Sequence, residues 1–125
     1  MKRTPAETIA AYFAATRAMD CKAWVACFDP AGVSHDPVGT PPHRGPAALG
    51  AFFDGIVGAT KTIGLDAQEV FFAGDEAAVR WRGHGTNKQG KAFEFNGIDV
   101  MRFGADGLIV ELHGYWDPRT LMAQL

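Results

Sequence analysis

The stretch KAFEFNGIDVMRF, residues 91–103, decides which side of the expected sheet faces the core. Because successive side chains of a β-strand point to opposite faces, every second residue of this stretch shares a face. One face is an apolar row interrupted by a single carboxyl group: Phe93, Phe95, Gly97, Asp99, Met101 and Phe103. The pattern predicts a strand that packs this row against the core.

Asp99 allows two interpretations. In a regular strand its carboxyl group is buried, and because an ionised carboxylate is costly there, it must find a partner or stay protonated. If Gly97 instead forms a β-bulge, the register slips and Asp99 turns outward. Alternation alone leaves both interpretations open.

Three more segments have the composition of strands, residues 60–72, 77–85 and 108–116. Short runs typical of hairpin turns separate the four strands: Ala73-Gly74-Asp75-Glu76, Asn87-Lys88-Gln89-Gly90 and Gly104-Ala105-Asp106-Gly107. The second half of the chain is therefore expected to be an antiparallel meander.

The first half has helix signals. Thr4-Pro5-Ala6-Glu7 is typical of a helix start, and apolar side chains follow at helical spacing from Ile9 through Tyr12 to Met19. Asp20 is expected to cap a second helix that carries Trp24, Val25 and Phe28, and Gly45-Pro46 to begin a third with Leu49, Phe52, Phe53 and Ile56 inside. A short helix is expected to follow Asp117-Pro118. Helices first and strands later indicate an α+β fold, with one domain over residues 1–125.

Composition excludes several classes of function. The chain has 125 residues and a formal net charge of −2 with no basic stripe, so no nucleic acid is expected as a partner. No apolar run reaches the roughly 18 residues of a membrane span, and the N-terminus lacks the apolar core of a signal peptide. Cys21 and Cys27 are expected to be free thiols, and a cytoplasmic location is the default expectation.

The second polar feature is Asp36, in VSHDPVGTPPHRG, residues 33–45. Asp-Pro and Pro-Pro pairs mark turns, and an aspartate near a turn often bonds its own backbone, so the segment can be purely structural. Alternatively, the rigid turn holds a carboxylate at the mouth of a pocket. In a polar turn Asp36 would stay ionised, near the reference pKa of about 3.9.

Tyr12 belongs to the apolar face of the first helix, where a buried hydroxyl usually finds a hydrogen-bond partner. With Asp36 and Asp99 it gives a possible site. An ionised carboxylate can accept a proton, while a neutral carboxylic acid and a phenol donate to a developing oxyanion. This combination indicates proton abstraction α to a carbonyl group, through an enol or dienolate.

Over nearly its whole length the chain resembles the Δ5-3-ketosteroid isomerases, within the nuclear-transport-factor-like (SnoaL-like) superfamily. The resemblance is carried by Asp36-Pro37-Val38-Gly39 with Pro41-Pro42 and Gly45, by Ile98-Asp99 with Arg102-Phe103, and by Tyr12 followed by Asp20. The division of roles between two aspartates and a tyrosine is the one known for ketosteroid isomerase. The resemblance implies a cystatin-like α+β fold, in which a cone-shaped, curved antiparallel sheet wraps around N-terminal helices and an apolar cavity.

Carried over by position, the resemblance implies that Asp36 is the general base and that Tyr12 and Asp99 are the oxyanion donors. It implies substrate contacts for Val38, Phe53, Trp81, Met101 and Trp116. The implied reaction converts a 3-oxo-Δ5 steroid to its 3-oxo-Δ4 isomer without a cofactor. The implied partners are an apolar, steroid-like ketone and a second copy of the chain, bound through the outer face of the sheet.

Phe28 and Phe53 depart from the relatives, some of which carry supporting tyrosines at the matching positions. Two alternatives remain: a non-catalytic domain that binds a small molecule or a partner, and a related dehydratase, cyclase or epoxide hydrolase. The histidines show no metal-ligand spacing, so no metal site is expected: His35, His43, His84 and His113. Strand parity points His113 outward.

Overall fold

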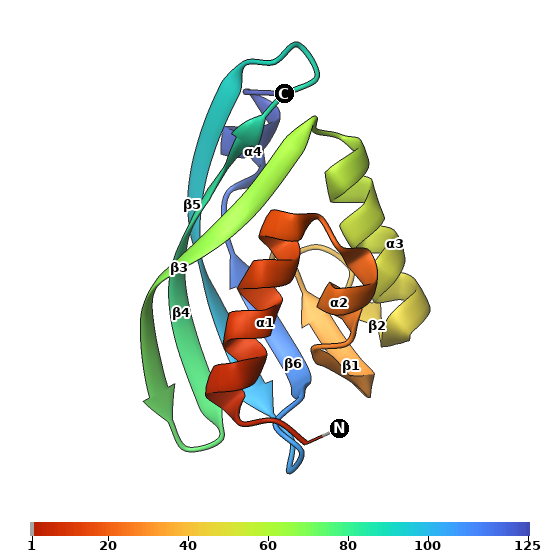
Figure 1. The fold of residues 1–125 in the computed structure, drawn as a ribbon, viewed down its shortest axis with the longest axis vertical. Helices are drawn as coiled ribbons and strands as arrows, with labels where there is room; N and C mark the ends of the chain where they lie inside the picture. The colour runs from red at the N-terminus through yellow and green to blue at the C-terminus, as the bar shows by residue number, and fades with distance from the viewer. Residues whose placement is uncertain (1) are drawn as a thin grey trace.

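The computed structural model describes residues 2–125 and has a six-stranded sheet that curves around helix α1 (Figure 1). The elements follow in the order α1 (Pro5–Ala18), α2 (Cys21–Val25), β1 (Phe28–His35), β2 (His43–Arg44), α3 (Gly45–Gly58), β3 (Thr62–Ala73), β4 (Glu76–Thr86), β5 (Ala92–Phe103), β6 (Ile109–Tyr115) and α4 (Pro118–Met122). The expected α+β class and the curved sheet around N-terminal helices are confirmed. None of the described helices combines the length and the hydropathy of a membrane span.

The sheet has the strand order β2-β1-β6-β5-β4-β3. Strands β3 to β6 form the expected antiparallel meander. Strand β1 lies parallel to β6 and extends the sheet beyond that meander. The parallel edge strand was not visible in the sequence, because a parallel pair joins segments far apart in the chain and leaves no hairpin signal between them.

The helix starts follow the capping residues of the sequence. At the start of α1, the Thr4 side chain accepts a hydrogen bond from the backbone N–H of Glu7, and the Glu7 side chain accepts one from the backbone N–H of Thr4. At the start of α2, the Asp20 side chain accepts a hydrogen bond from the backbone N–H of Ala23. Helix α2 ends at Val25, however, and Phe28 is the first residue of β1, where it pairs with Ile109. Placing Phe28 in this helix was wrong, because a pairing with the distant strand β6 overrides the local helical spacing.

Glycines give the inner face of the sheet room for aromatic rings. Gly97 lies directly across from Trp81 and Gly83 directly across from Phe95 in the β4–β5 pair, and a Cβ atom on either glycine would collide with the facing ring. The β4–β5 register runs without a shift through Asp99, which is 1% exposed. The structure therefore excludes the bulge at Gly97 and confirms the inward-facing Asp99.

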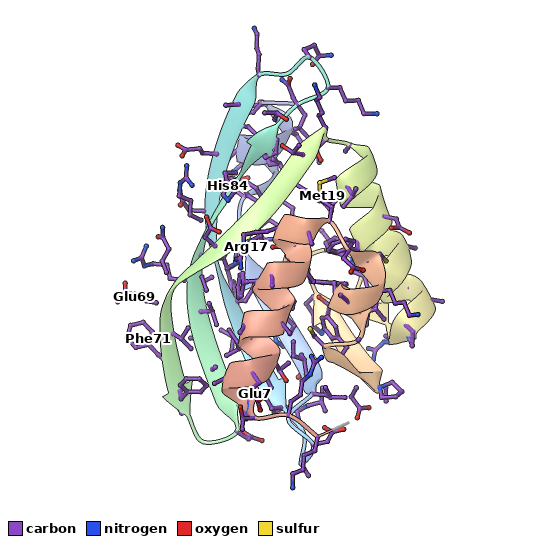
Figure 2. The ribbon with its side chains drawn as sticks, viewed as in Figure 1. Glu7, Arg17, Met19, Glu69, Phe71 and His84 are labelled. Atoms are coloured by element: carbon purple, nitrogen blue, oxygen red, sulfur yellow. The ribbon has the colours of Figure 1, made fainter. Side chains whose placement is uncertain are left out.

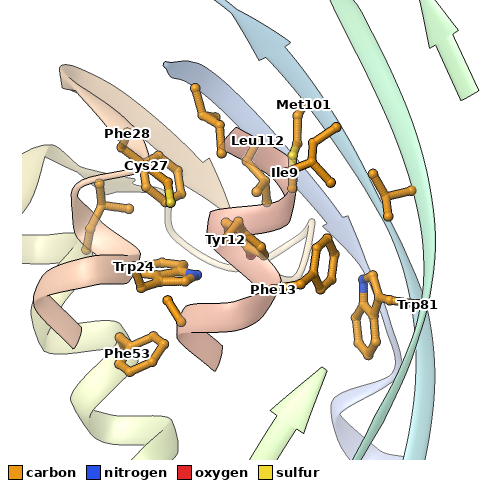
Figure 3. Close-up of a cluster of buried hydrophobic side chains, with 14 of the residues drawn as sticks. Ile9, Tyr12, Phe13, Trp24, Cys27, Phe28, Phe53, Trp81, Met101 and Leu112 are labelled. Carbon is orange, nitrogen blue, oxygen red and sulfur yellow. The ribbon is translucent and has the colours of Figure 1, made fainter. Parts of the chain in front are cut away.

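The core lies between the inner face of the sheet and the helices. Tyr12 and Phe13 of α1 pack there with Trp24 of α2, and Met101 of β5 lies near Ile9 of α1 (Figure 3). Cys21 and Cys27 are free thiols, as expected. The far half of β3 extends past the helices and exposes Phe71, whose side chain points away from the molecule (Figure 2).

The Gly97–Trp81 pair predicts a local cost of adding a side chain. Gly97→Ala should lower the free energy of unfolding by about 1–3 kcal/mol, because the new methyl group must displace the buried Trp81 ring. Urea denaturation measures the change. Gly55→Ala in α3 is the matched control: its methyl group meets nothing, so the variant should be stabilised by about 0.5–1 kcal/mol. Equal stability of the two variants would contradict this account of the sheet.

Candidate active site

A pocket of about 570 Å³, counted to its open mouth, lies between the helices and the inner face of the sheet. The lining is mainly aromatic and aliphatic: Tyr12, Thr16, Trp24, Asp36, Phe52, Phe53, Ile56, Val57, Ile63, Leu65, Trp81, Phe95, Asp99, Trp116 and Leu121. The described lining residues include two carboxyl groups and no arginine, histidine or cysteine.

Asp36 follows the last residue of β1 and enters the pocket wall. Its peptide bond to Pro37 is cis, and the next residue, Val38, is fastened to β6 by a backbone hydrogen bond from its N–H to the carbonyl oxygen of Gly114, 2.9 Å long. The indole N–H of Trp116 donates a hydrogen bond of 2.6 Å to Asp36 Oδ1. Asp36 and the turn after it are therefore held by Gly114 of β6 (Ile109–Tyr115) and by Trp116, which follows β6.

The environment of Asp36 differs from the expected polar turn, since the residue is only 8% exposed. Burial raises the pKa of Asp36 from 3.8 to about 6, against the hydrogen bond from Trp116, which favours the ionised form. The expectation of an unshifted pKa was wrong, because the sequence shows the turn and not the apolar walls around it. Near pH 7 the carboxyl group is still mostly ionised.

Asp99 lies deeper in the same pocket. Burial raises its pKa well above the ordinary range, and the charge of Asp36 adds to the effect; the donors on Trp81 and Tyr12 act in the opposite direction. Asp99 Oδ2 and Trp81 Nε1 are both buried, and neither forms a hydrogen bond of normal geometry among the described residues, so the Trp81 donor acts on the pKa of Asp99 only from nearby. Burial and the charge of Asp36 thus favour the neutral carboxylic acid form of Asp99, and its Oδ2 has no partner among the described residues.

Gly114 lets the two carboxyl groups approach each other. It pairs with Asp99 across the β5–β6 ladder, and a Cβ atom on it would collide with Asp36 Oδ1 and lie 3.3 Å from Asp99 Oδ1. Both carboxyl groups therefore reach the space directly in front of one glycine. Like charges this close disfavour ionisation of both groups, and the more deeply buried Asp99 is the one whose pKa rises well above its ordinary value.

Tyr12 of α1 is the third polar side chain of the pocket, beside Asp36 and Asp99. It is 2% exposed, and burial raises the pKa of its hydroxyl well above 10.0, with the neighbouring carboxyl groups of Asp99 and Asp36 acting in the same direction. Its ring packs at centroid distances of 5.6 Å from Trp24 and 6.3 Å from Phe28 (Figure 3). Tyr12 is therefore a neutral phenol packed among aromatic rings.

The expected substrate contacts divide into two groups. Phe53, Trp81 and Trp116 line the pocket. Met101 is fully buried outside the lining, because α1 covers that part of β5, and Val38 is 45% exposed, because the turn directs it outward. The structure therefore places three of these five residues at the pocket.

Several lining residues were not singled out as site residues from the sequence. Phe52 and Ile56 belong to the predicted buried stripe of α3, so their inward direction was visible but not their role. Phe95 shares the face of Asp99 and carried the same signal. Trp24 and Leu121 gave none, because their helices reach the pocket only through tertiary packing.

Comparison with known proteins shows the family of the chain. The profile of the SnoaL-like domain matches residues 9–112 of the chain. The chain belongs to the SnoaL-like domain family. A steroid Δ-isomerase of Nocardioides simplex is similar to this chain. The two sequences are 32% identical over 114 residues, which cover 91% of this chain and 90% of that protein.

Solved structures of SnoaL-like and related proteins share the fold. RV0760c of Mycobacterium tuberculosis, in complex with estradiol-17β-hemisuccinate, has 26% sequence identity and a TM-score of 0.81, and covers 94% of this chain and 98% of its own. SalBIII, an epoxide hydrolase/cyclase-like enzyme of pyran ring formation in salinomycin, has 24% sequence identity and a TM-score of 0.82. The match covers 93% of this chain and 92% of SalBIII. The resemblance to the isomerase family and its fold is thus confirmed at the level of the family.

The raised pKa of Asp36 predicts a cost to stability at neutral pH. Because the folded protein binds this proton more tightly than a chain with the ordinary pKa of 3.8, the carboxyl group contributes stability below pH 3.8 that is lost as pH rises through about 6. Relative to the wild type, Asp36→Asn should gain up to about 3 kcal/mol of unfolding free energy between pH 3.5 and pH 7.5. Urea denaturation at both pH values measures it. Asp54→Asn, on the exposed side of α3, is the control, and a variant Asp36→Asn that follows the wild type at both pH values would contradict the buried, shifted carboxyl group.

Proposed function

We propose that the protein is a cofactor-free isomerase that shifts a carbon–carbon double bond into conjugation with a ketone. Asp36 is the general base, and Tyr12 and Asp99 donate hydrogen bonds to the oxygen of the intermediate. The observation that carries the proposal is the pair of carboxyl groups in one apolar pocket whose pKa values are shifted to different extents, with Asp36 at about 6 and Asp99 well above its ordinary range. Such a pair separates the roles of base and acid.

The proposed reaction has two proton transfers. The Asp36 carboxylate takes a proton from the carbon between the ketone and the double bond, and the electron pair moves onto the ketone oxygen to give a dienolate. Asp36 then returns the same proton to the far carbon of the dienolate, so the product differs from the substrate only in the position of the double bond. A base with a pKa near 6 is mostly ionised at neutral pH and therefore ready to accept a proton, and its protonated form returns that proton readily to the dienolate.

The neutral donors stabilise the dienolate oxygen. A protonated Asp99 and a neutral Tyr12 each donate a hydrogen bond without a positive charge, and in a pocket that excludes water such bonds strengthen as negative charge develops. The unpartnered Asp99 Oδ2 has the bonding capacity that this role requires. Trp81 Nε1 is a second buried group without a partner among the described residues, an N–H donor, and it adds a polar group to the end of the pocket where Asp99 lies.

The substrate class follows from the lining and from the relatives. The apolar walls favour a fused-ring or similarly apolar ketone with few polar groups. The similar protein from Nocardioides simplex is a steroid Δ-isomerase, and RV0760c binds an estradiol derivative. We therefore propose a 3-oxo-Δ5 steroid, or a ketone of similar shape, as substrate. The outer face of the sheet exposes the paired residues Ile98 and Tyr115, which supports the proposed homodimer.

The base assignment predicts the effect of removing one carboxylate. With a 3-oxo-Δ5 steroid, the purified protein should generate conjugated-enone absorbance, and Asp36→Asn should lower kcat by about 10²–10⁴-fold, because general-base catalysis contributes in this range. Binding of a phenolic steroid, which resembles the dienolate, should remain. Asp54→Asn should keep the wild-type rate. Wild-type turnover in Asp36→Asn would show that Asp36 is not the base.

The Trp116 hydrogen bond predicts a shift in the pH profile. Because it favours the ionised form of Asp36, Trp116→Phe should raise the pKa of that carboxyl group above about 6. The rising limb of kcat/KM against pH reports the pKa of the base in the free enzyme and should move to higher pH in the variant. Tyr115→Phe changes the adjacent, outward side chain and should leave the profile unchanged. A Trp116→Phe profile with the wild-type midpoint would contradict this role of the indole N–H.

A binding protein of the same family is the second candidate. The estradiol-17β-hemisuccinate complex of RV0760c favours it, since that structure shows a similar fold with a steroid derivative bound. It predicts tight binding of the phenolic steroid without enone formation, and no effect of Asp36→Asn on any turnover. Enone formation that Asp36 controls distinguishes the isomerase from this candidate.

A further inference from the structure

Three ligating side chains meet on the face of the sheet opposite the pocket. Asp36 is turned inward, so its neighbour His35 points outward by alternation, as do Glu111 and His113 on β6. His35 and His113 are directly paired in the parallel β1–β6 ladder. Their rings stack with centroids 4.5 Å apart and an angle of 6° between their planes.

The donor atoms of this group already lie close together. One ring nitrogen of His35, one of His113 and one carboxylate oxygen of Glu111 all lie within 4.8 Å of one another, and all three residues are partly buried. Ligand atoms around a tetrahedral ion with bonds of about 2.0–2.2 Å are about 3.4 Å apart. Because a metal ion lies in the plane of each imidazole that binds it, the stacked rings must also rotate out of their parallel arrangement. The paired strands fix the backbone of both histidines, so this change involves side-chain torsions alone.

We propose that His35, Glu111 and His113 form a binding site for a divalent transition-metal ion, with Zn²⁺ as the best-matched ion. Two imidazoles and one carboxylate are a donor set that zinc takes in proteins, whereas Mg²⁺ and Ca²⁺ prefer oxygen ligands only. Three protein ligands leave a further position for water. The site lies outside the pocket and is independent of the proposed isomerase activity.

Arg102 is the competing group. Its guanidinium lies 3.7 Å from Glu111 across the β5–β6 ladder, on the same outer face. Both side chains of this ion pair are partly exposed, and pairs of this kind contribute little to stability. A metal ion can therefore take Glu111 from Arg102 at small cost, and the removal of Arg102 should strengthen metal binding.

A bound ion would join the two strands that hold the base. His35 directly precedes Asp36, and His113 directly precedes Gly114, which accepts the backbone hydrogen bond of Val38. An ion that links His35 to His113 therefore fastens β1 to β6 at the point where both strands turn toward the pocket. Because it binds the folded chain and not the separated strands, it should raise the melting temperature.

The test is a zinc titration of the full chain, freed of any affinity tag and treated with a chelator, by isothermal titration calorimetry. We expect saturable binding of one Zn²⁺ per chain and no comparable binding of Mg²⁺. His113→Gln and Glu111→Gln should each weaken binding by at least about tenfold, as loss of a ligand does. Arg102→Gln should tighten it, and His43→Gln, which removes an imidazole outside the group, should leave it unchanged.

A second measurement separates a loss of ligands from a loss of fold. Co²⁺ in place of Zn²⁺ has a visible absorption band that reports its ligands, and the band should change in His113→Gln while the far-ultraviolet circular dichroism of the metal-free variant stays that of the wild type. No saturable zinc binding by the wild type, or equal binding by the wild type, His113→Gln and Glu111→Gln, would overturn the proposal.

Discussion

The burial of two carboxyl groups in one apolar pocket is the constraint around which this protein is organised. Asp36 and Asp99 converge in front of Gly114, and the charge on Asp36 adds to the burial that keeps Asp99 protonated. An unpartnered charge in such a place is expensive, so the structure provides Asp36 with the Trp116 indole N–H at 2.6 Å. The free energy that this burial costs is offset by the aromatic and aliphatic core around it.

The shape of the sheet makes this pocket possible. Glycines stand across from large rings on the inner face, as Gly97 does for Trp81, so the rings fill space that a second side chain would otherwise occupy. The parallel strand β1 then brings Asp36 beside the end of β6, next to Trp116. The same β1–β6 pair places His35 against His113 on the outer face. One strand pairing therefore positions Asp36 on the inner side of the sheet and the two histidines on the outer side.

Much of the site was predictable from short-range patterns. Alternation in residues 91–103 left two orientations of Asp99 open, and the regular register through Gly97 selects the inward one. Capping signals at Thr4 and Asp20 located α1 and α2. The prediction failed for Phe28, and for the pKa of Asp36, because each depends on contacts with residues far away in the chain.

The sequence by itself determined where the helices begin and where the hairpins turn, since caps and turns act over a few neighbouring residues. Only the tertiary structure decided that Asp36 is buried, that Trp116 donates to it, and that His35 meets His113. These three results depend on the parallel pairing of β1 with β6. Such a pairing is set by the packing of the whole chain, because the segments it joins share no turn and no local periodicity.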